Sequence, residues 1–132
     1  MAINSNTKGK VAEREVAELL KKYRFEARRG VQYSGGSDSP DVVSNLGLHI
    51  EVKRVEAFNL YSAVDQAIKD SNSIDYVIFH RKNKRDWQAI LDARTFLSIV
   101  ENRKDLCEAN DKLREEINRL KNIEEKYNAL TR

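Results

Sequence analysis

Residues 40–53 read PDVVSNLGLHIEVK, and the way this segment pairs with itself determines much of the remaining fold. Pro40–Val43 is typical of a short strand, and Leu48–Lys53 is typical of a longer one. The tripeptide at 45–47, Asn-Leu-Gly, suits a three-residue hairpin loop with Gly47 at the position of positive φ. The segment therefore predicts a β-hairpin.

The expected register of this hairpin brings two acids together. If Ser44 pairs with Leu48, Asp41 lies directly opposite Glu51. Directly opposed residues have Cβ atoms about 5 Å apart, and like charges there destabilise a sheet. A divalent cation reverses that sign, because two carboxylates at this separation can chelate one hard ion. Side chains alternate along a strand, so Lys53 shares the face of Glu51. Two acids and a lysine on one face predict a metal-dependent site for a phosphate ester.

The opposite face of the longer strand is apolar, and Leu48, Ile50 and Val52 are expected to point into a core. Further elements are expected on both sides of the hairpin. They are a helix from 4–7 to about Tyr23, a strand at Phe25–Tyr33, a helix at about Leu60–Ser71, strands at Tyr76–Phe79 and Trp87–Leu91, and a helix capped by Thr95. This order predicts an α/β fold with one mixed central sheet flanked by helices.

The first expected helix carries three acids at different angles to its apolar stripe. The stripe comprises Ala12, Val16, Ala17, Leu19, Leu20 and Tyr23. At about 100° per residue, Glu13 lies nearest the stripe, Glu15 further round and Glu18 near the opposite side. We therefore expect Glu13 to look inward, Glu15 to be structural and Glu18 to be solvated. Glu13 could also be a surface acid, favoured by its place near the helix N-terminus.

The amino-acid composition changes at about Glu101, after which the chain is rich in charged residues and contains no proline or glycine. Apolar residues recur there every seven positions, with an isoleucine and an asparagine at the intervening seam positions. They are Leu106, Leu113, Leu120 and Tyr127, with Ile117 and Asn110. This pattern predicts a coiled-coil helix whose seam asparagine fixes the register, with a seam shift after Leu120. The sequence thus divides into a domain at 1–100 and a tail at 101–132, and the tail could pair with its twin, pack back or recruit a partner.

Composition limits the classes of function. Charged residues make up 34% of the 132 residues, and no apolar run approaches a membrane span or a signal peptide, which predicts a cytoplasmic protein. The single cysteine, Cys107, excludes an intrachain disulfide, and two histidines argue against a histidine-rich metal site. The net charge of +3 arises within residues 1–100, which hold sixteen Lys/Arg against thirteen Asp/Glu. A basic zone near an acidic pocket is typical of enzymes that act on nucleic acids.

Several motifs together resemble one nuclease family. They are Lys8-Gly9, Glu13-Arg14-Glu15, Phe25, Arg29, Pro40-Asp41 and Ile50-Glu51-Val52-Lys53. Over residues 7–70 this arrangement resembles the archaeal-type Holliday junction resolvases of the PD-(D/E)xK nuclease superfamily, of which related enzymes occur in phages. The long glycine-rich segment between Arg29 and Asp41 and the coiled-coil tail depart from the family pattern.

The resemblance implies a restriction-endonuclease-like fold and a Mg²⁺-dependent endonuclease in which Mn²⁺ can substitute. It implies that Glu13, Asp41, Glu51 and Lys53 are catalytic, and that Asp41, Glu51, the Val52 carbonyl and Glu13 hold the metal. Basic and hydroxyl side chains are expected to contact DNA, with Gln66 as an auxiliary site residue from the second long helix. These DNA-contacting residues are Lys8, Lys10, Arg14, Arg29 and Ser34. The family acts on four-way DNA junctions as a homodimer, with one active site for each of two opposed strands, and a phage-encoded member would work in the host cytoplasm.

The sequence is compatible with three functions. The first is a junction-resolving endodeoxyribonuclease, and the second is a less selective nuclease of the same superfamily that acts on flaps or linear duplex. The third is a non-catalytic DNA-binding or coiled-coil adaptor. The segment at 34–39 could follow the junction backbone or act only as a connector, and His49 could touch the site or serve as a structural histidine.

Overall fold

The computed structural model describes residues 4–30 and 39–132 of the chain. It separates into an α/β unit, Met1–Thr95, and a helical unit, Phe96–Arg132. The second unit therefore begins at Phe96, five residues before the boundary at Glu101 that the sequence pattern predicts. The elements in order are α1 (Ser5–Lys22), β1 (Ala27–Arg29), β2 (Val42–Ser44), β3 (His49–Arg54), α2 (Leu60–Ser71), β4 (Tyr76–Arg81), β5 (Gln88–Ile90) and α3 (Ala93–Leu130).

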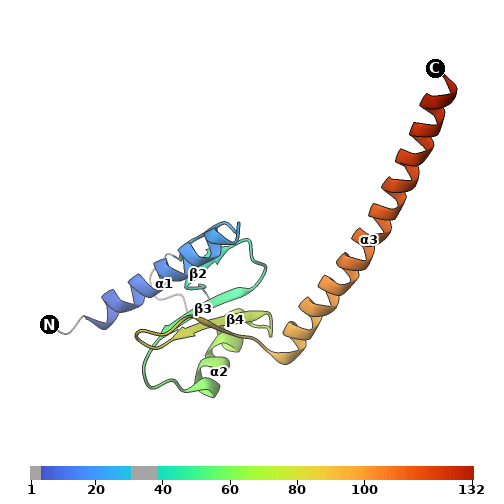
Figure 1. Ribbon diagram of the computed structural model, residues 1–132. Coiled ribbons are helices and arrows are strands. Elements are labelled where there is room, and N and C mark those ends of the chain that lie inside the picture. The colour runs from blue at the N-terminus through green and yellow to red at the C-terminus, as the bar shows by residue number, and fades with distance from the viewer. Residues whose placement is uncertain (1–3, 31–38) are drawn as a thin grey trace. The chain divides into compact units, whose positions relative to one another are not determined.

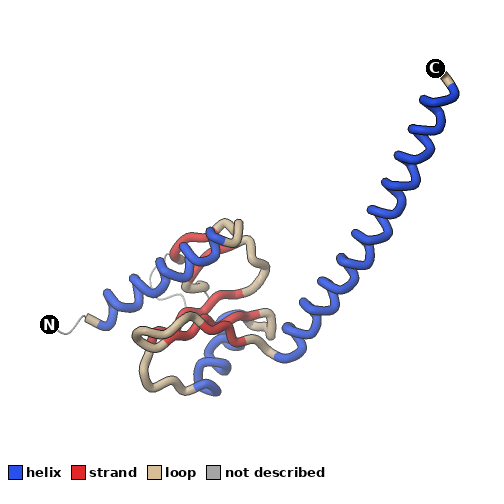
Figure 2. Tube along the Cα trace, viewed as in Figure 1, coloured by secondary structure: helices blue, strands red, loops and turns tan. Residues whose placement is uncertain are grey.

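Within the described residues, the α/β unit has one five-stranded sheet in the order β1-β2-β3-β4-β5. Pairing is antiparallel except between β3 and β4, which run parallel and are joined through α2. The mixed central sheet predicted from the sequence is therefore present. Figures 1 and 2 show α1 and α2 on opposite sides of these strands.

The hairpin register agrees with the sequence prediction. Val42 pairs with Ile50, which is the same register as the predicted pairing of Ser44 with Leu48. Gly47 has a φ of 85°, the left-handed conformation that the loop requires and that glycine adopts without steric cost. Loop length and the position of one glycine were therefore sufficient to align Asp41 with Glu51.

Alternation along the strands divides the core into two clusters. Val42, Ile50 and Val77 pack against α1 through residues such as Val16, which is completely buried. Tyr76 and Ile78, on the other face of β4, pack against Ala63 and Ala67 of α2. The face of β3 that carries His49, Glu51 and Lys53 is thus the face that α2 covers.

Three details differ from the sequence-based expectations. Strand β1 is shorter than the predicted Phe25–Tyr33, although residues 31–33 lie outside the described residues. Tyr23 was expected in the apolar stripe but is 72% exposed, because α1 ends at Lys22 and Phe25 packs against the core instead. Thr95 does not cap α3, because the helix begins at Ala93.

The residue that caps this helix is Asp92, whose Oδ1 accepts the Arg94 N–H at 2.9 Å. Thr95 is buried, and its hydroxyl donates to the Ile74 carbonyl at 2.8 Å. That hydrogen bond fastens the first turn of α3 to the loop before β4.

Glu15 has the structural role expected of it. Its carboxylate receives two hydrogen bonds from the Arg81 guanidinium, at 3.0 and 3.1 Å, and lies 3.6 Å from Arg54 Nη1. The Arg81 guanidinium also lies 5.3 Å from the centre of the Trp87 ring. One acid on α1 therefore neutralises two arginines, one on each of the parallel strands β3 and β4.

Replacement of Glu15 with Ala should lower the free energy of unfolding by about 2 kcal/mol, because two half-buried guanidinium groups lose their shared acceptor. For a unit of this size the melting temperature should fall by about 10 °C. Fluorescence of Trp87, the only tryptophan, reports unfolding of this unit. Glu18→Ala is the matched control, because its exposed pair with Lys21 is worth less than about 1 kcal/mol. Equal melting temperatures for the two variants would contradict this role for Glu15.

The helical unit consists of the greater part of α3, which has 38 residues and runs without interruption to Leu130. Among the described residues, no helix combines the length and the apolar character needed to cross a membrane.

Candidate functional site

Asp41 is held in place by the backbone of β3, the longer strand of the hairpin. Its N–H donates to the Ile50 carbonyl at 2.9 Å, and its Oδ2 accepts the Val52 N–H at 2.8 Å. The side chain thereby continues the hydrogen-bond ladder just before β2 begins. Because both contacts are to backbone, the Asp41 carboxylate is fixed beside Glu51 as the register predicts.

Glu51 is a buried acid in an unfavourable electrostatic environment. Only 3% of the residue is exposed, since α2 covers this face of β3. Burial, followed by the charge of Asp41 and a side-chain hydrogen bond with it, raises the Glu51 pKa to about 8, and Lys53 offsets only part of this. The hairpin thus brings two carboxylates together at a place where, without a cation, both cannot easily be ionised.

His49 contacts the site directly. Its Nε2 lies 2.8 Å from Glu51 Oε1, and one hydrogen is shared between them. Burial lowers the His49 pKa and so favours the neutral imidazole, although the charges of Asp70 and Asp41 act in the opposite direction. Of the two roles left open for His49, the structure gives it a contact with the expected site acid.

Lys53 is positioned by α2. Its Nζ donates to Gln66 Oε1 at 2.9 Å, so the lysine and the proposed auxiliary residue meet. Gln66 lies away from the apolar side of α2, and it is exposed. It meets Lys53 because the polar flank of α2 lies beside the end of β3, within reach of the long lysine side chain.

Asp70 is a neighbour of the candidate site that the sequence reasoning missed. Its charge contributes to the raised pKa of Glu51 and opposes the lowering of the His49 pKa, so it lies near both. Asp70 is four residues after Gln66 and therefore on the same face of α2. Once Gln66 is assigned to the site, this spacing is the signal that would have identified Asp70.

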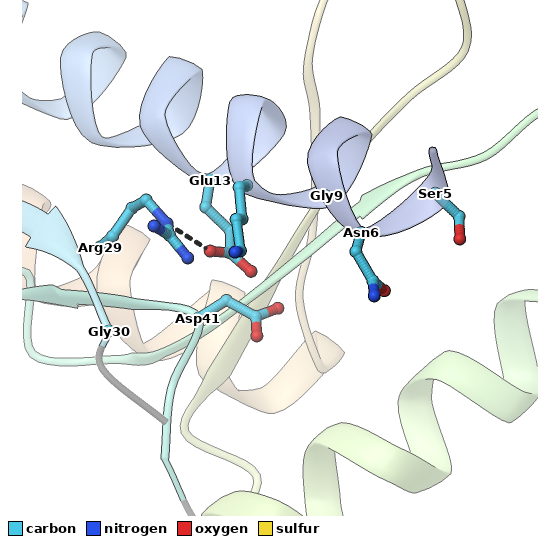
Figure 3. Close-up of a pocket in the computed structure, with 8 residues that line it drawn as sticks. Ser5, Asn6, Gly9, Glu13, Arg29, Gly30 and Asp41 are labelled. Carbon is cyan, nitrogen blue, oxygen red and sulfur yellow. Dashed lines mark hydrogen bonds and ion pairs between the residues drawn. The ribbon is translucent and has the colours of Figure 1, made fainter. Parts of the chain in front are cut away.

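Glu13 belongs to a cleft on the other side of Asp41. Its Oε2 accepts a hydrogen bond from Arg29 Nε at 2.8 Å, and Figure 3 shows Glu13 and Asp41 pointing into this cleft from α1 and from the segment before β2. The cleft has a volume of about 620 Å³. It is lined by Ser5, Asn6, Gly9, Lys10, Glu13, Arg29, Gly30 and Asp41.

Gly30 forms the floor where β1 meets the segment before β2. Its N–H donates to the Asp41 carbonyl at 2.9 Å, and a Cβ at this position would overlap the Pro40 carbonyl. The close approach permitted by glycine brings Arg29 and Asp41 to the same cleft. Asp41 is therefore the residue common to the cleft and to the group formed by Glu51, His49 and Lys53.

The expected metal ligands are brought near one another, although not as a ready-made cage. Within residues 4–30 and 39–132, no group of three or more His, Cys, Asp or Glu side chains is arranged to hold a metal ion. Glu13 is engaged by Arg29, and Val52 meets the site through its N–H rather than through the carbonyl named as a ligand. The donor set nevertheless fits a hard cation such as Mg²⁺, because Asp41 and Glu51 offer oxygens and their mutual repulsion would be relieved by positive charge.

The expected DNA-contacting residues do not all lie on one surface. Lys10 and Arg29 line the cleft, whereas Arg14 lines a separate surface hollow together with Val11 and Trp87. Lys8 is half-buried on α1, and Ser34 lies outside the described residues. Of the five, the structure therefore places two at the cleft that contains Asp41.

Comparison with known proteins returned no match to this chain among protein-family models, curated proteins or solved structures.

Proposed function

We propose that this chain is a Mg²⁺-dependent endodeoxyribonuclease that resolves four-way DNA junctions, working as a homodimer with one site for each of two opposed strands. The observation that supports it most is the pairing of Asp41 with buried Glu51 across the hairpin, beside Lys53. A fold gains nothing by burying two facing acids alone, whereas an enzyme that binds a cation gains a ligand pair.

The residues divide the chemistry between them. Asp41 and Glu51 would hold Mg²⁺, with the Val52 carbonyl and Glu13 as further ligands, and the bound metal would supply Lewis-acid assistance and an acidified water. The Lys53 ammonium, oriented by Gln66, would position that water or stabilise charge developing on the phosphate oxygens. His49 would keep the Glu51 carboxylate oriented through its Nε2 contact.

The cleft beside Asp41 is the proposed path of the DNA strand. Lys10 and Arg29, the latter paired with Glu13, place cationic side chains on its walls, and groups of this kind bind phosphates without reading sequence. Gly9 lies on α1 at the edge of this cleft, where a Cβ would meet no atom within 4 Å. Glycine inside a helix costs stability, and here no packing within the described residues requires it. Close approach of the sugar-phosphate backbone to α1 would explain it.

Gly9→Ala should therefore raise stability while lowering affinity for the junction. The helix should gain about 0.5–1 kcal/mol from the better helix former, and the added methyl should lower junction affinity about tenfold by obstructing the phosphate backbone. Junction affinity is measured by titration in Ca²⁺ and stability by Trp87 fluorescence. Glu18→Ala, on the exposed side of the same helix, should leave affinity unchanged. Unchanged affinity for Gly9→Ala would contradict the proposed strand path.

The proposed function is tested by incubating the full chain with a synthetic four-way junction and, separately, with linear duplex of the same sequence, in Mg²⁺. Paired nicks in the junction with little duplex cleavage are the expected result. Equal cleavage of both substrates would indicate the less selective nuclease, and binding without cleavage in either Mg²⁺ or Mn²⁺ would indicate the adaptor.

A further inference from the structure

The helical unit presents an apolar stripe that its own residues leave uncovered. Every residue from Phe96 to Arg132 is exposed to solvent. Leu106, Leu113, Leu120 and Tyr127 are 66%, 60%, 52% and 66% exposed, respectively. A single helix surrounded by water is marginal, because helices in proteins take most of their stability from packing an apolar face. We therefore expect a partner to pack against the apolar stripe along its length.

The stripe has the spacing of a two-stranded coiled coil. With Leu106 at a d position, the d positions are Ile99, Leu106, Leu113, Leu120 and Tyr127, and the a positions are Phe96, Arg103, Asn110 and Ile117. Leucine at successive d positions is the usual choice of parallel dimers. After Leu120 the next apolar residues are Ile123, Tyr127 and Leu130. The heptad phase therefore shifts at Ile123, three residues after Leu120, and the apolar seam continues from there to the end of the helix.

Asn110 indicates which partner α3 binds and in which orientation. It favours a second copy of α3 over other partners, and a parallel pair over an antiparallel one. In a parallel, in-register pair, each a residue meets the same residue of its twin, so two Asn110 side chains face and can hydrogen-bond each other. An antiparallel or shifted pair would set Asn110 against a leucine and leave a buried amide without a partner. The asparagine therefore favours a partner that carries asparagine at the same level, which a second copy of α3 does.

The flanking charges also suit a parallel pair. Glu116 occupies a g position and Lys121 the following e position, and in parallel dimers g meets the next e of the partner. In the part of the chain that the structure describes, Glu116 pairs with Arg119, whose Nε donates to Glu116 Oε2 at 2.9 Å, and this contact is exposed, so the carboxylate remains accessible from solvent. Two symmetric Glu116–Lys121 contacts would flank Ile117 at the centre of the seam.

We propose that α3 pairs with α3 of a second copy in a parallel, in-register coiled coil from about Phe96 to Leu130. Because the α/β unit ends where this helix begins, parallel pairing attaches two α/β units to the same end of one coil. The proposal concerns α3 alone and does not rest on the nuclease function.

Cysteine cross-linking in the full chain tests both pairing and orientation. In a Cys107→Ser background, Leu106→Cys and Leu120→Cys are prepared separately and oxidised without DNA or metal. The two positions are separated by about 21 Å along the helix, so only a parallel, in-register pair lets each variant cross-link to itself. Glu115→Cys, at an f position facing away from the seam, is the control and should remain uncross-linked.

Dimer bands from both seam variants and none from Glu115→Cys are the expected result. Cross-linking only in a mixture of Leu106→Cys and Leu120→Cys would show antiparallel pairing and overturn the proposal. Because cysteine could weaken the seam, the Cys107→Ser chain with its leucines intact is also examined by light scattering. A monomer at about 100 µM, well above the dissociation constants expected of a useful dimer, would overturn the proposal whatever the cross-linking shows.

Discussion

Asp41→Asn should abolish cleavage of a four-way junction, with the single-turnover rate in Mg²⁺ falling by at least about 10³-fold. Asparagine keeps the size of the side chain and an oxygen that can accept the Val52 N–H, which Asp41 Oδ2 accepts at 2.8 Å. What is lost is the negative charge beside Glu51. The expected loss therefore reports the missing charge rather than a broken hairpin.

Two measurements separate this result from unfolding. Trp87 fluorescence should show a melting temperature at least as high as that of the unmodified chain, because removing the Asp41 charge also relieves Glu51. Asp86→Asn, in the loop between β4 and β5, is the control for loss of one carboxylate and should cleave normally. A near-normal rate for Asp41→Asn would remove Asp41 from the proposed site.

The geometry of the hairpin was predictable from sequence because it depends on local features. A three-residue loop with Gly47 at its end leaves one register that keeps Ile50 in the core, and a slip by one residue would place Glu51 there instead. The position of Asp41 opposite Glu51 follows from that register. The partial burial of Glu13 and the exposure of Glu18 were also predictable from local features, because the helical period determines which side of α1 each residue occupies.

The environment of the site was not predictable, because it depends on how distant segments pack. Nothing near residue 51 indicates that α2 will cover the acid face of β3, and this covering is what buries Glu51 and brings Gln66 to Lys53. Asp70 was missed for the same reason. The Glu15 contacts with Arg81 join residues 66 positions apart, a separation at which sequence periodicity carries no information about pairing.

The raised pKa of Glu51 makes stability depend on pH in a definite direction. The unfolded chain should release this proton near 4.5, whereas the folded chain holds it to about 8. Folded protein therefore carries a proton that unfolded protein lacks between these values. The contribution to stability is complete below about pH 4.5 and is lost as the pH rises through about 8. Since one pKa unit corresponds to about 1.4 kcal/mol, several kcal/mol should be lost over this window in metal-free solution.

Glu51→Gln should consequently lose cleavage and gain stability. Glutamine resembles the protonated acid and cannot ionise, so at about pH 9 without metal this variant should melt about 5 °C or more above the unmodified chain, and near pH 4.5 the two should agree. Comparing the two chains at each pH largely cancels titratable groups that lie far from residue 51 and are present in both. Melting is followed by Trp87 fluorescence in EDTA, and cleavage is measured on the junction in Mg²⁺.

Adding metal should narrow the difference between the two chains. Mg²⁺ at about 10 mM should raise the melting temperature of the unmodified chain at about pH 9, because a cation bound only to the folded state stabilises it by mass action. Glu51→Gln has lost one of the two facing carboxylates and should respond little. A structural acid would behave differently, since its removal would lower stability with or without metal. Equal melting temperatures in EDTA at about pH 9 would show that Glu51 is not held in conflict with Asp41, and the chemical argument for a cation between them would fail.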